Sequence, residues 1–269
     1  MKTASTPHNF IAKPPKKDFW LLFKVASIDR LVQMQKGLLY MNSLEYFSNL
    51  EGEESLALRA DKLEKVYGIL RAGNTPSGYA TLSIKVNDEE VDLGSDAVLT
   101  AHFPRPENTM LFCMGAFADN EDGLILNEID GKIHFDKRFL DFGSHVLLIN
   151  KPSEFSYRIN KAIKKLPGTF SSKLLDDGYG LVDYKPLENY SGPIGLYIKD
   201  CKYSWQMEFR ISFGVHKQCL NSKGALELNI GDISDISDIV PVQALIDKPF
   251  EVKRRTFVKV GDAYEQINN

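Results

Sequence analysis

One run of five residues, Gln206-Met207-Glu208-Phe209-Arg210, combines side chains that take part in many enzyme mechanisms. Successive side chains of a β-strand point to opposite faces, so Gln206, Glu208 and Arg210 are expected to share one face. In a cleft, the Glu208 carboxylate could stabilise positive charge that develops on a bound ribose. The structural alternative is a polar face that meets solvent, or a Glu208–Arg210 ion pair across a sheet.

A strand is the element expected to carry this run, because residues 203–214 are rich in β-branched and aromatic side chains. The apolar segment at 19–25 predicts a second buried strand near the start of the chain. Apolar residues at helical spacing predict a helix over 28–36 that ends at Gly37, and residues 38–42 return to an extended pattern. The two opening strands are expected to be neighbours in the core.

The same signals predict further elements along the chain. Strands are expected at 79–86, 89–93, 109–114, 133–135, 145–149 and 194–198. The first two form a hairpin, because Asn87-Asp88 is a favoured turn dipeptide. A helix is predicted over 153–165 with Ser153 as its N-cap.

These elements predict an α+β fold of two packed mixed or antiparallel sheets with flanking helices. A single domain is expected over residues 18–269. Residues 1–17 are rich in proline, lysine and small polar side chains, and they are expected to form a flexible leader.

Composition argues against several classes of protein. Apolar residues make up 43% and charged residues 26% of the chain, which is typical of a globular protein rather than a disordered or fibrous one. The net charge of −3 argues against broad adsorption to nucleic-acid backbones. Three cysteines without a Cys-x-x-Cys pair indicate a reducing compartment. The sequence contains no run of about 18 consecutive apolar residues, so a membrane span is not expected. A cytoplasmic location is therefore expected.

The Gln206 and Glu208 pair resembles the ADP-ribosyltransferase superfamily, whose catalytic strand commonly carries a glutamate preceded two positions earlier by Gln or Glu. Members of that family also place a basic residue or a histidine on the first core strand, and a Tyr or Ser on the strand after the next helix. The matching residues here are Lys24, Tyr40 and Ser43, which would face NAD. The resemblance implies the split β-sandwich of that family within the α+β class.

The same resemblance implies a function. Glu208 would hydrogen-bond the nicotinamide ribose and favour an oxocarbenium-like transition state, while Gln206 would orient the acceptor. NAD would be the substrate, and a protein or a nucleic acid would accept the ADP-ribose. The layout is also similar to uncharacterised bacterial and phage proteins of defence or toxin type. Independently of the resemblance, Arg59 could bind a pyrophosphate or an acidic substrate, although its alternative role is a local ion pair on an exposed helix.

Two other classes of function remain open. A non-catalytic module that binds a partner predicts no NAD binding and tolerance of substitutions at Glu208. A metal-dependent enzyme that processes nucleic acids would gather Asp61, Glu64 and Glu208 around a divalent ion. The five histidines form no metal-binding motif, and the sequence contains no phosphate-binding glycine loop. Cys113 lies in an apolar run and is expected to be a structural thiol rather than a nucleophile.

Overall fold

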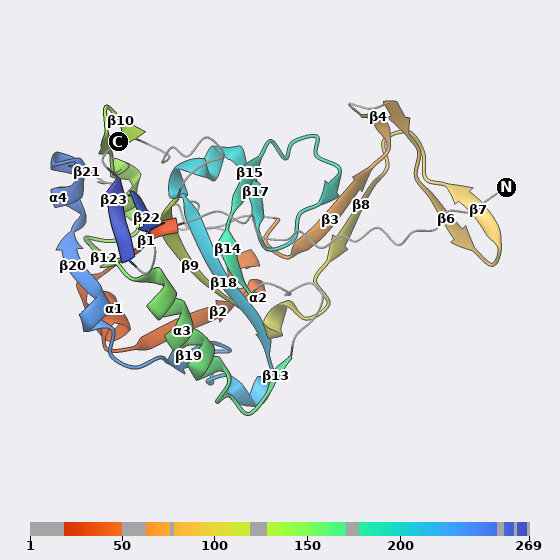
Figure 1. Cartoon of the computed structure of the whole chain (residues 1–269). Helices are drawn as coiled ribbons and strands as arrows, with labels where there is room; N and C mark the ends of the chain where they lie inside the picture. Colours follow the sequence, from red (N-terminus) through yellow and green to blue (C-terminus); the bar gives the residue numbers. More distant parts are fainter. Residues whose placement is uncertain are drawn as a thin grey trace.

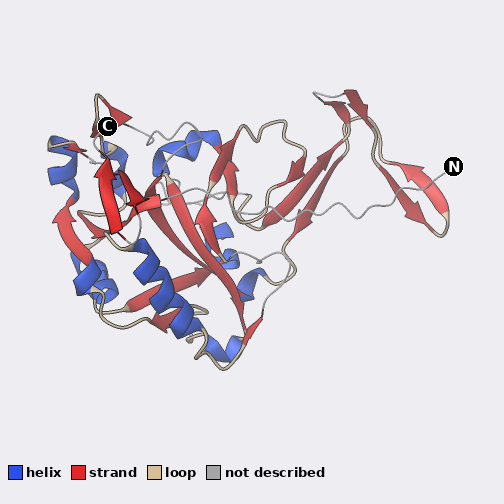
Figure 2. Ribbon diagram, viewed as in Figure 1, coloured by secondary structure: helices blue, strands red, loops and turns tan. Residues whose placement is uncertain are grey.

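The computed structural model describes residues 19–49, 63–75, 78–118, 128–170, 178–251, 256–260 and 263–267. These residues form mostly antiparallel strands with a few helices, so the predicted α+β class is confirmed (Figure 2). The predicted leader over 1–17, as well as Arg59 and Asp61, lies outside the described residues. None of the helices in the described ranges is long and apolar enough to cross a membrane.

The largest sheet holds the central strands of the molecule in one hydrogen-bonded order (Figure 1). From edge to edge the strands are β13 (Thr169–Phe170), β18 (Glu208–Val215), β9 (Thr109–Ala118), β1 (Phe19–Ala26), β12 (His145–Ile149) and β20 (Ser237–Pro241). Three more strands complete this main sheet, namely β14 (Tyr179–Leu181) beside β18, β2 (Leu38–Ser43) beside β9 and β19 (Leu226–Asn229) beside β2. All of these pairings are antiparallel.

Strands β1 and β2 share one edge of β9, because β18 occupies the other edge. β1 pairs with the C-terminal half of β9 as far as Gly115, and β2 pairs with the N-terminal end at Met110 and Leu111. The expectation that β1 and β2 would be neighbours in the core is confirmed, because both contribute to one buried cluster. They do not pair with each other, since the two strands diverge along β9. Between them, α1 (Ile28–Gln35) is followed by Gly37, whose φ of 102° favours glycine.

The longest helix that the structure describes is α3 (Pro152–Ile163), which buries an apolar face that includes Phe155. Its N-cap is Lys151 rather than the predicted Ser153, because Pro152 fits the first helical position with its fixed φ. The other helical elements are α2 (Leu44–Ser48), α4 (Val242–Asp247), η1 (Pro106–Asn108), η2 (Lys137–Asp141), η4 (Cys201–Gln206), η5 (Lys217–Cys219) and η6 (Ser234–Ile236). Those labelled η are single 3-10 turns or slightly longer.

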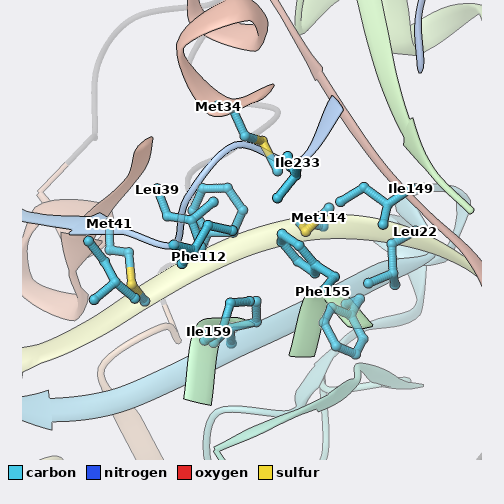
Figure 3. Close-up of a cluster of buried hydrophobic side chains, with 14 of the residues drawn as sticks. Leu22, Met34, Leu39, Met41, Phe112, Met114, Ile149, Phe155, Ile159 and Ile233 are labelled. Atoms are coloured by element: carbon cyan, nitrogen blue, oxygen red, sulfur yellow. The ribbon is translucent and has the colours of Figure 1, made fainter. Parts of the chain in front are cut away.

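One face of the main sheet carries the largest buried cluster, which we call the helix-side cluster. Figure 3 shows part of it, with Leu22 from β1, Met41 from β2, Met114 from β9 and Phe155 from α3 in one interior. Full burial of such side chains contributes roughly 1.5–3 kcal/mol each relative to exposure. This cluster determines which faces of β9 and β18 are left for other side chains.

The opposite face of the main sheet carries two smaller clusters. The aromatic cluster is centred on Phe23 and Phe117, whose ring centroids lie 5.1 Å apart. The outer cluster contains Leu111 of β9 together with Leu196 and Tyr197. β9 contributes Phe117 to the aromatic cluster and Leu111 to the outer cluster. Polar side chains of the neighbouring strand β18 can therefore be enclosed between these two clusters.

The segment between β2 and β9 leaves the main sheet as a ribbon. β3 (Val66–Arg71) pairs with β8 (Val98–His102) and with β16 (Gly192–Pro193). Farther along the ribbon, β4 (Gly73–Thr75) pairs with β5 (Gly78–Ala80), and β6 (Ser83–Val86) pairs with β7 (Glu89–Asp92). Figure 1 shows the ribbon, in orange and yellow, extending away from the rest of the molecule. The predicted hairpin is confirmed, with Asn87 and Asp88 at positive φ in the turn between β6 and β7.

The predicted strand over 194–198 is wrong in its position. The structure instead has β15 (Asp183–Lys185) pairing in parallel with β17 (Ile198–Asp200). Residues 194–197 form a buried turn in which Gly195 has a φ of 63°, a conformation that interrupts an extended run. The remaining small sheets join β10 (Glu128–Ile129), β11 (Lys132–Ile133) and β21 (Phe250–Glu251), and join β22 (Thr256–Val260) and β23 (Ala263–Ile267).

Candidate functional site

The polar run that the sequence singles out spans a break between two elements. η4 ends at Gln206, Met207 follows in the left-handed region with a φ of 45°, and β18 begins at Glu208. The expectation that Gln206 lies on the same strand as Glu208 is therefore wrong. Asp200 caps η4 by accepting a hydrogen bond from the Lys202 backbone N–H at 3.0 Å. Gln206 consequently reaches the site from a helical turn, and not from the strand.

The polar face of β18 is buried. Phe209 and Ile211 point into the helix-side cluster, as alternation along a strand predicts. On the other face, Glu208 is 5% exposed, Arg210 is 2% exposed and Ser212 is fully buried. The predicted alternative of a solvated polar face is therefore wrong, and each of these polar groups needs a partner inside the protein.

Arg210 is the centre of this enclosed polar region. Its Nη1 and Nη2 atoms donate to the two carboxylate oxygens of Glu64 at 2.9 and 2.6 Å. Its Nε atom donates to Oε1 of Glu208 at 2.8 Å, and Nη1 also donates to the backbone oxygen of Leu196 at 2.8 Å. A lysine could not reproduce this bridging geometry, because it lacks the planar fork of donors. Since Glu64 precedes β3 in the chain, these bonds link the ribbon to the main sheet.

Lys199 of β17 supplies a second cation. Its Nζ atom lies 3.1 Å from Oε2 of Glu208, 3.2 Å from Oε1 of Gln206 and 3.9 Å from Oε1 of Glu64. The side chains of Gln206 and Glu208 therefore converge on one point, although they approach it from different elements. We call the five residues the buried network: Glu64, Lys199, Gln206, Glu208 and Arg210. Its two carboxylates balance its two cations, which limits the cost of burying charge.

Burial and neighbouring charges act in opposite directions on the ionisable groups of the network. Burial by itself raises the pKa of Glu208, but the charges of Arg210 and Lys199 outweigh burial and hold that pKa well below its usual value. Burial likewise lowers the pKa of Arg210, whereas the carboxylates of Glu208 and Glu64 raise it well above its usual value. Glu208 and Arg210 are therefore both charged at neutral pH.

Two weaker acids border the network. The hydroxyl of Tyr184 accepts a hydrogen bond from the Glu208 backbone N–H at 2.9 Å. Desolvation and the charge of Glu208 raise the pKa of Tyr184. Desolvation is also the main cause of a raised pKa at Cys113, which lies opposite Arg210 in the pairing of β9 with β18. Both groups stay protonated at neutral pH, so Cys113 lacks the thiolate that a nucleophile needs.

Lys24 lies where β1 and β2 diverge. Its Nζ atom donates to the backbone oxygen of Cys113 and lies 4.9 Å from the centroid of the Phe112 ring. Cys113 falls between the residues of β9 that pair with β1 and those that pair with β2. The ammonium thus donates to a carbonyl at the divergence of the two strands, a structural role that requires no ligand.

The other residues expected to face NAD lie in different surroundings. Ser43 is buried, and its Oγ accepts a hydrogen bond from the Tyr46 backbone N–H at 3.1 Å, which caps α2. Tyr40 is 41% exposed on β2, opposite Glu227 of β19. Arg59 lies outside the described ranges. The two residues predicted to be catalytic therefore converge, whereas Lys24 and Ser43 take part in local structural contacts.

The metal-dependent alternative would place Asp61, Glu64 and Glu208 around a divalent ion. Glu64 and Glu208 do converge, but Arg210 and Lys199 lie against their carboxylate oxygens. In the parts of the chain that the structure describes, no group of three His, Cys, Asp or Glu side chains could hold a metal ion. Asp61 lies outside those parts. Within the buried network, side-chain cations thus occupy the positions that a metal would take.

Lys199 and Tyr184 are members of the site that the sequence did not predict. Lys199 directly follows the apolar and aromatic segment 194–198. A lysine beside such a segment is a usable signal, because lysine is almost never fully buried unless it has a partner. Tyr184 carries no comparable signal, since its contact is with the backbone of a residue 24 positions away.

Chemically, the site places the ionised carboxylate of Glu208 and the amide oxygen of Gln206 on one ammonium, that of Lys199, in surroundings that exclude most water. Such a carboxylate stabilises positive charge that develops next to it more strongly than it would in water. Comparisons with protein-family models, with curated proteins and with solved structures gave no significant match for this chain. The residues and their geometry are therefore the basis for assigning a function.

Proposed function

We propose that the protein is an NAD-dependent ADP-ribosyltransferase-like enzyme in which Glu208 is the catalytic carboxylate. The observation that carries the proposal is the convergence of the Glu208 carboxylate and the Gln206 amide on one point beside Lys199. A glutamate and a glutamine two positions apart are the pair on which the resemblance to that superfamily rests. Their convergence supports a shared role even though they belong to different elements.

The energetic cost of the network also supports a functional role. Well-packed apolar residues in place of a buried ion pair are often neutral or stabilising, so such a pair is weak evidence for a role in stability alone. Ionisable groups with strongly shifted pKa values concentrate at functional sites. Between Gln206 and Glu208, the left-handed backbone of Met207 adds a local conformational cost.

In the proposed reaction, the bond between nicotinamide and ribose breaks and nicotinamide leaves with the bonding electrons. Glu208 would accept a hydrogen bond from a ribose hydroxyl and stabilise the positive charge left on the ribose. Because Oε2 of Glu208 is 3.1 Å from the Lys199 ammonium, the hydroxyl would have to displace that ammonium. Gln206 would then orient the acceptor, a protein or a nucleic acid. A nucleophilic atom of the acceptor would form the new bond to the ribose carbon and release its proton to solvent.

The fold that accompanies this proposal is a split β-sandwich. It is supported by the divergence of β1 and β2 along one edge of β9, which opens the main sheet on the edge opposite β18. Lys24 lies at this divergence, and Tyr40 lies on β2, so both are placed on the two strands that separate.

A non-catalytic protein that binds a partner is the second candidate, and one observation favours it. Both oxygens of Glu208 already have cationic partners, Arg210 at 2.8 Å and Lys199 at 3.1 Å. In that case the buried network has a structural role, because it joins β18 to the ribbon and to β17. This candidate predicts that NAD does not bind.

Release of nicotinamide from NAD, measured for the wild type and two variants, separates the candidates. Glu208→Gln removes the proposed catalytic charge, whereas Glu64→Gln removes the other carboxylate of the same network and serves as the matched control. Each variant leaves Arg210 with one carboxylate, so each is expected to be destabilised by up to about 3–5 kcal/mol. At a temperature where both are folded, release should fall at least about 100-fold in Glu208→Gln and less than about tenfold in Glu64→Gln.

Two outcomes would contradict the enzymatic proposal. A folded wild-type protein that neither binds NAD nor releases nicotinamide, with protein and nucleic-acid acceptors present, would favour the partner-binding candidate. Equal losses of activity in the two variants would mean that Glu208 acts only through the integrity of the network. The circular dichroism spectrum of each variant verifies that it is folded in the assay.

A further inference from the structure

The hairpin β6–β7, which we call the arm, carries an uncovered apolar face. Ile84 pairs with Val91 and Val86 pairs with Glu89, so these four side chains share one face of the hairpin. Ile84, Val86 and Val91 are 41%, 49% and 45% exposed. A two-stranded hairpin is at best marginally stable in water, so an arm with a bare apolar face gains stability from a surface that covers it.

The charge of the arm restricts what can cover it. Residues 83–92 contain one basic residue, Lys85, and four acidic ones, Asp88, Glu89, Glu90 and Asp92. Their net charge is therefore −3, and because the whole chain also carries −3, the remainder is neutral overall. This charge disfavours a nucleic acid, and it also disfavours the arm of a second copy, since like charges would meet. A surface that combines basic and apolar groups fits best.

One side of α3 and its C-cap has these properties. Tyr157, Lys161 and Lys164 are spaced by four and then three residues, so they lie along the same side of the helix. Tyr157 is 60% exposed, and both lysines are exposed. Among the described residues, Lys161, Lys164 and Glu89 of the arm take part in no ion pair. The aromatic ring and the two free cations match an apolar face with one free carboxylate.

We propose that the arm of one copy of this chain packs against Tyr157, Lys161 and Lys164 of α3 in a second copy. Figure 1 shows the arm at one end of the molecule and α3 in the body, well separated, so the arm does not reach α3 of its own chain. The Tyr157 ring covers the apolar face, and Glu89 faces the two lysines. This interaction is independent of the chemistry proposed for Glu208.

The proposal is tested by sedimentation velocity of the full chain over a range of concentrations. The wild type should self-associate, and Glu89→Lys alone or Lys161→Glu with Lys164→Glu should each weaken association by about tenfold or more. All three substitutions together restore opposite charges across the interface, so association should return to within a few fold of the wild type. Higher ionic strength should weaken the wild-type association, because salt screens exposed charges.

A matched control carries the same charge changes elsewhere. Lys217 and Lys223 are exposed, and Lys217→Glu with Lys223→Glu should leave association unchanged. A wild type that stays monomeric at every accessible concentration would overturn the proposal. The partner of the arm would then be a basic surface of another protein. The proposal would also be overturned by an effect of the α3 reversals no larger than that of the control, or by a failure of the combined reversals to restore association.

Discussion

The buried network and the arm both contain ion pairs of similar length, yet their surroundings differ. Arg210 and Glu208 are separated by 2.8 Å and their side chains are 2% and 7% exposed. Lys85 and Asp88 of the arm are separated by 2.9 Å, and their side chains are 67% and 96% exposed. Water and salt weaken the exposed pair, whereas loss of one partner from the buried pair leaves an uncompensated charge. The distance between two charged groups is therefore a poor guide to what they contribute.

The largest expected effect comes from Arg210→Met. This substitution leaves Glu64 and Glu208 buried with Lys199 as their remaining cation, so the free energy of unfolding should fall by about 3–5 kcal/mol. Lys85→Met is the matched control in the arm, and it should change stability by less than about 0.5 kcal/mol. Urea unfolding followed by circular dichroism measures both. A similar loss of unfolding free energy in the two variants would show that the buried and the exposed ion pairs contribute equally to stability.

A smaller effect is expected from glycine substitutions next to these two regions, at Gly115 opposite Glu208 and at Gly94 beyond the arm. A Cβ atom on Gly115 would overlap the ring of Phe23, so Gly115→Ala should cost about 1–3 kcal/mol as the aromatic cluster shifts. Gly94, just beyond β7, has open space around it but a φ of +91°, so Gly94→Ala should cost about 1 kcal/mol. Thermal unfolding of both variants measures the difference. A smaller loss at Gly115 than at Gly94 would mean that the aromatic cluster packs loosely.

The smallest effect concerns the dependence of stability on pH. The folded-state pKa of Glu208 lies below its usual value of 4.5, so its ionised form stabilises the fold above pH 4.5. This stabilisation is lost as the pH falls from 4.5 toward the folded pKa, and the loss already amounts to about 1 kcal/mol at pH 4. Urea midpoints between pH 7 and pH 4 should therefore fall less steeply for Glu208→Gln than for the wild type.

Glu90→Gln is the control for this pH experiment, because Glu90 lies on the exposed arm. Its urea midpoints should run parallel to those of the wild type. If the urea midpoint fell with pH as steeply in Glu208→Gln as in the wild type, the pKa of Glu208 would be close to its usual value. The two cations of the network would then contribute less than their distances indicate.

Parts of the fold with strong local signals could be predicted from the sequence. Asn87-Asp88 marks the turn of the arm, and Gly37 marks the end of α1, because each needs a backbone conformation that few residues adopt easily. Strand positions were less predictable. The apolar residues at 194–197 are buried in a turn, since burial alone does not require an extended backbone.

The candidate site could be predicted only in part. Alternation correctly placed Glu208 and Arg210 on one face, but not their burial, which depends on segments distant in the sequence. Lys199 and Glu64 reach the same point from β17 and from the residues before β3, and no local pattern indicates such a meeting. The position of Gln206 depends on the left-handed backbone of Met207. This conformation could not be predicted from the sequence, because methionine rarely adopts it.

The pairing of β3 with β8 has a consequence for the evolution of the chain. These strands place Arg71 opposite Val98, so the chain leaves and re-enters the β3–β8 pair at neighbouring points. The entropy of closing such an excursion rises only slowly with its length. Everything between Arg71 and Val98 could thus be lengthened, exchanged or deleted while the strand order of the main sheet stays the same. The arm could therefore change during evolution, and with it the surface that the protein binds, while the main sheet stays the same.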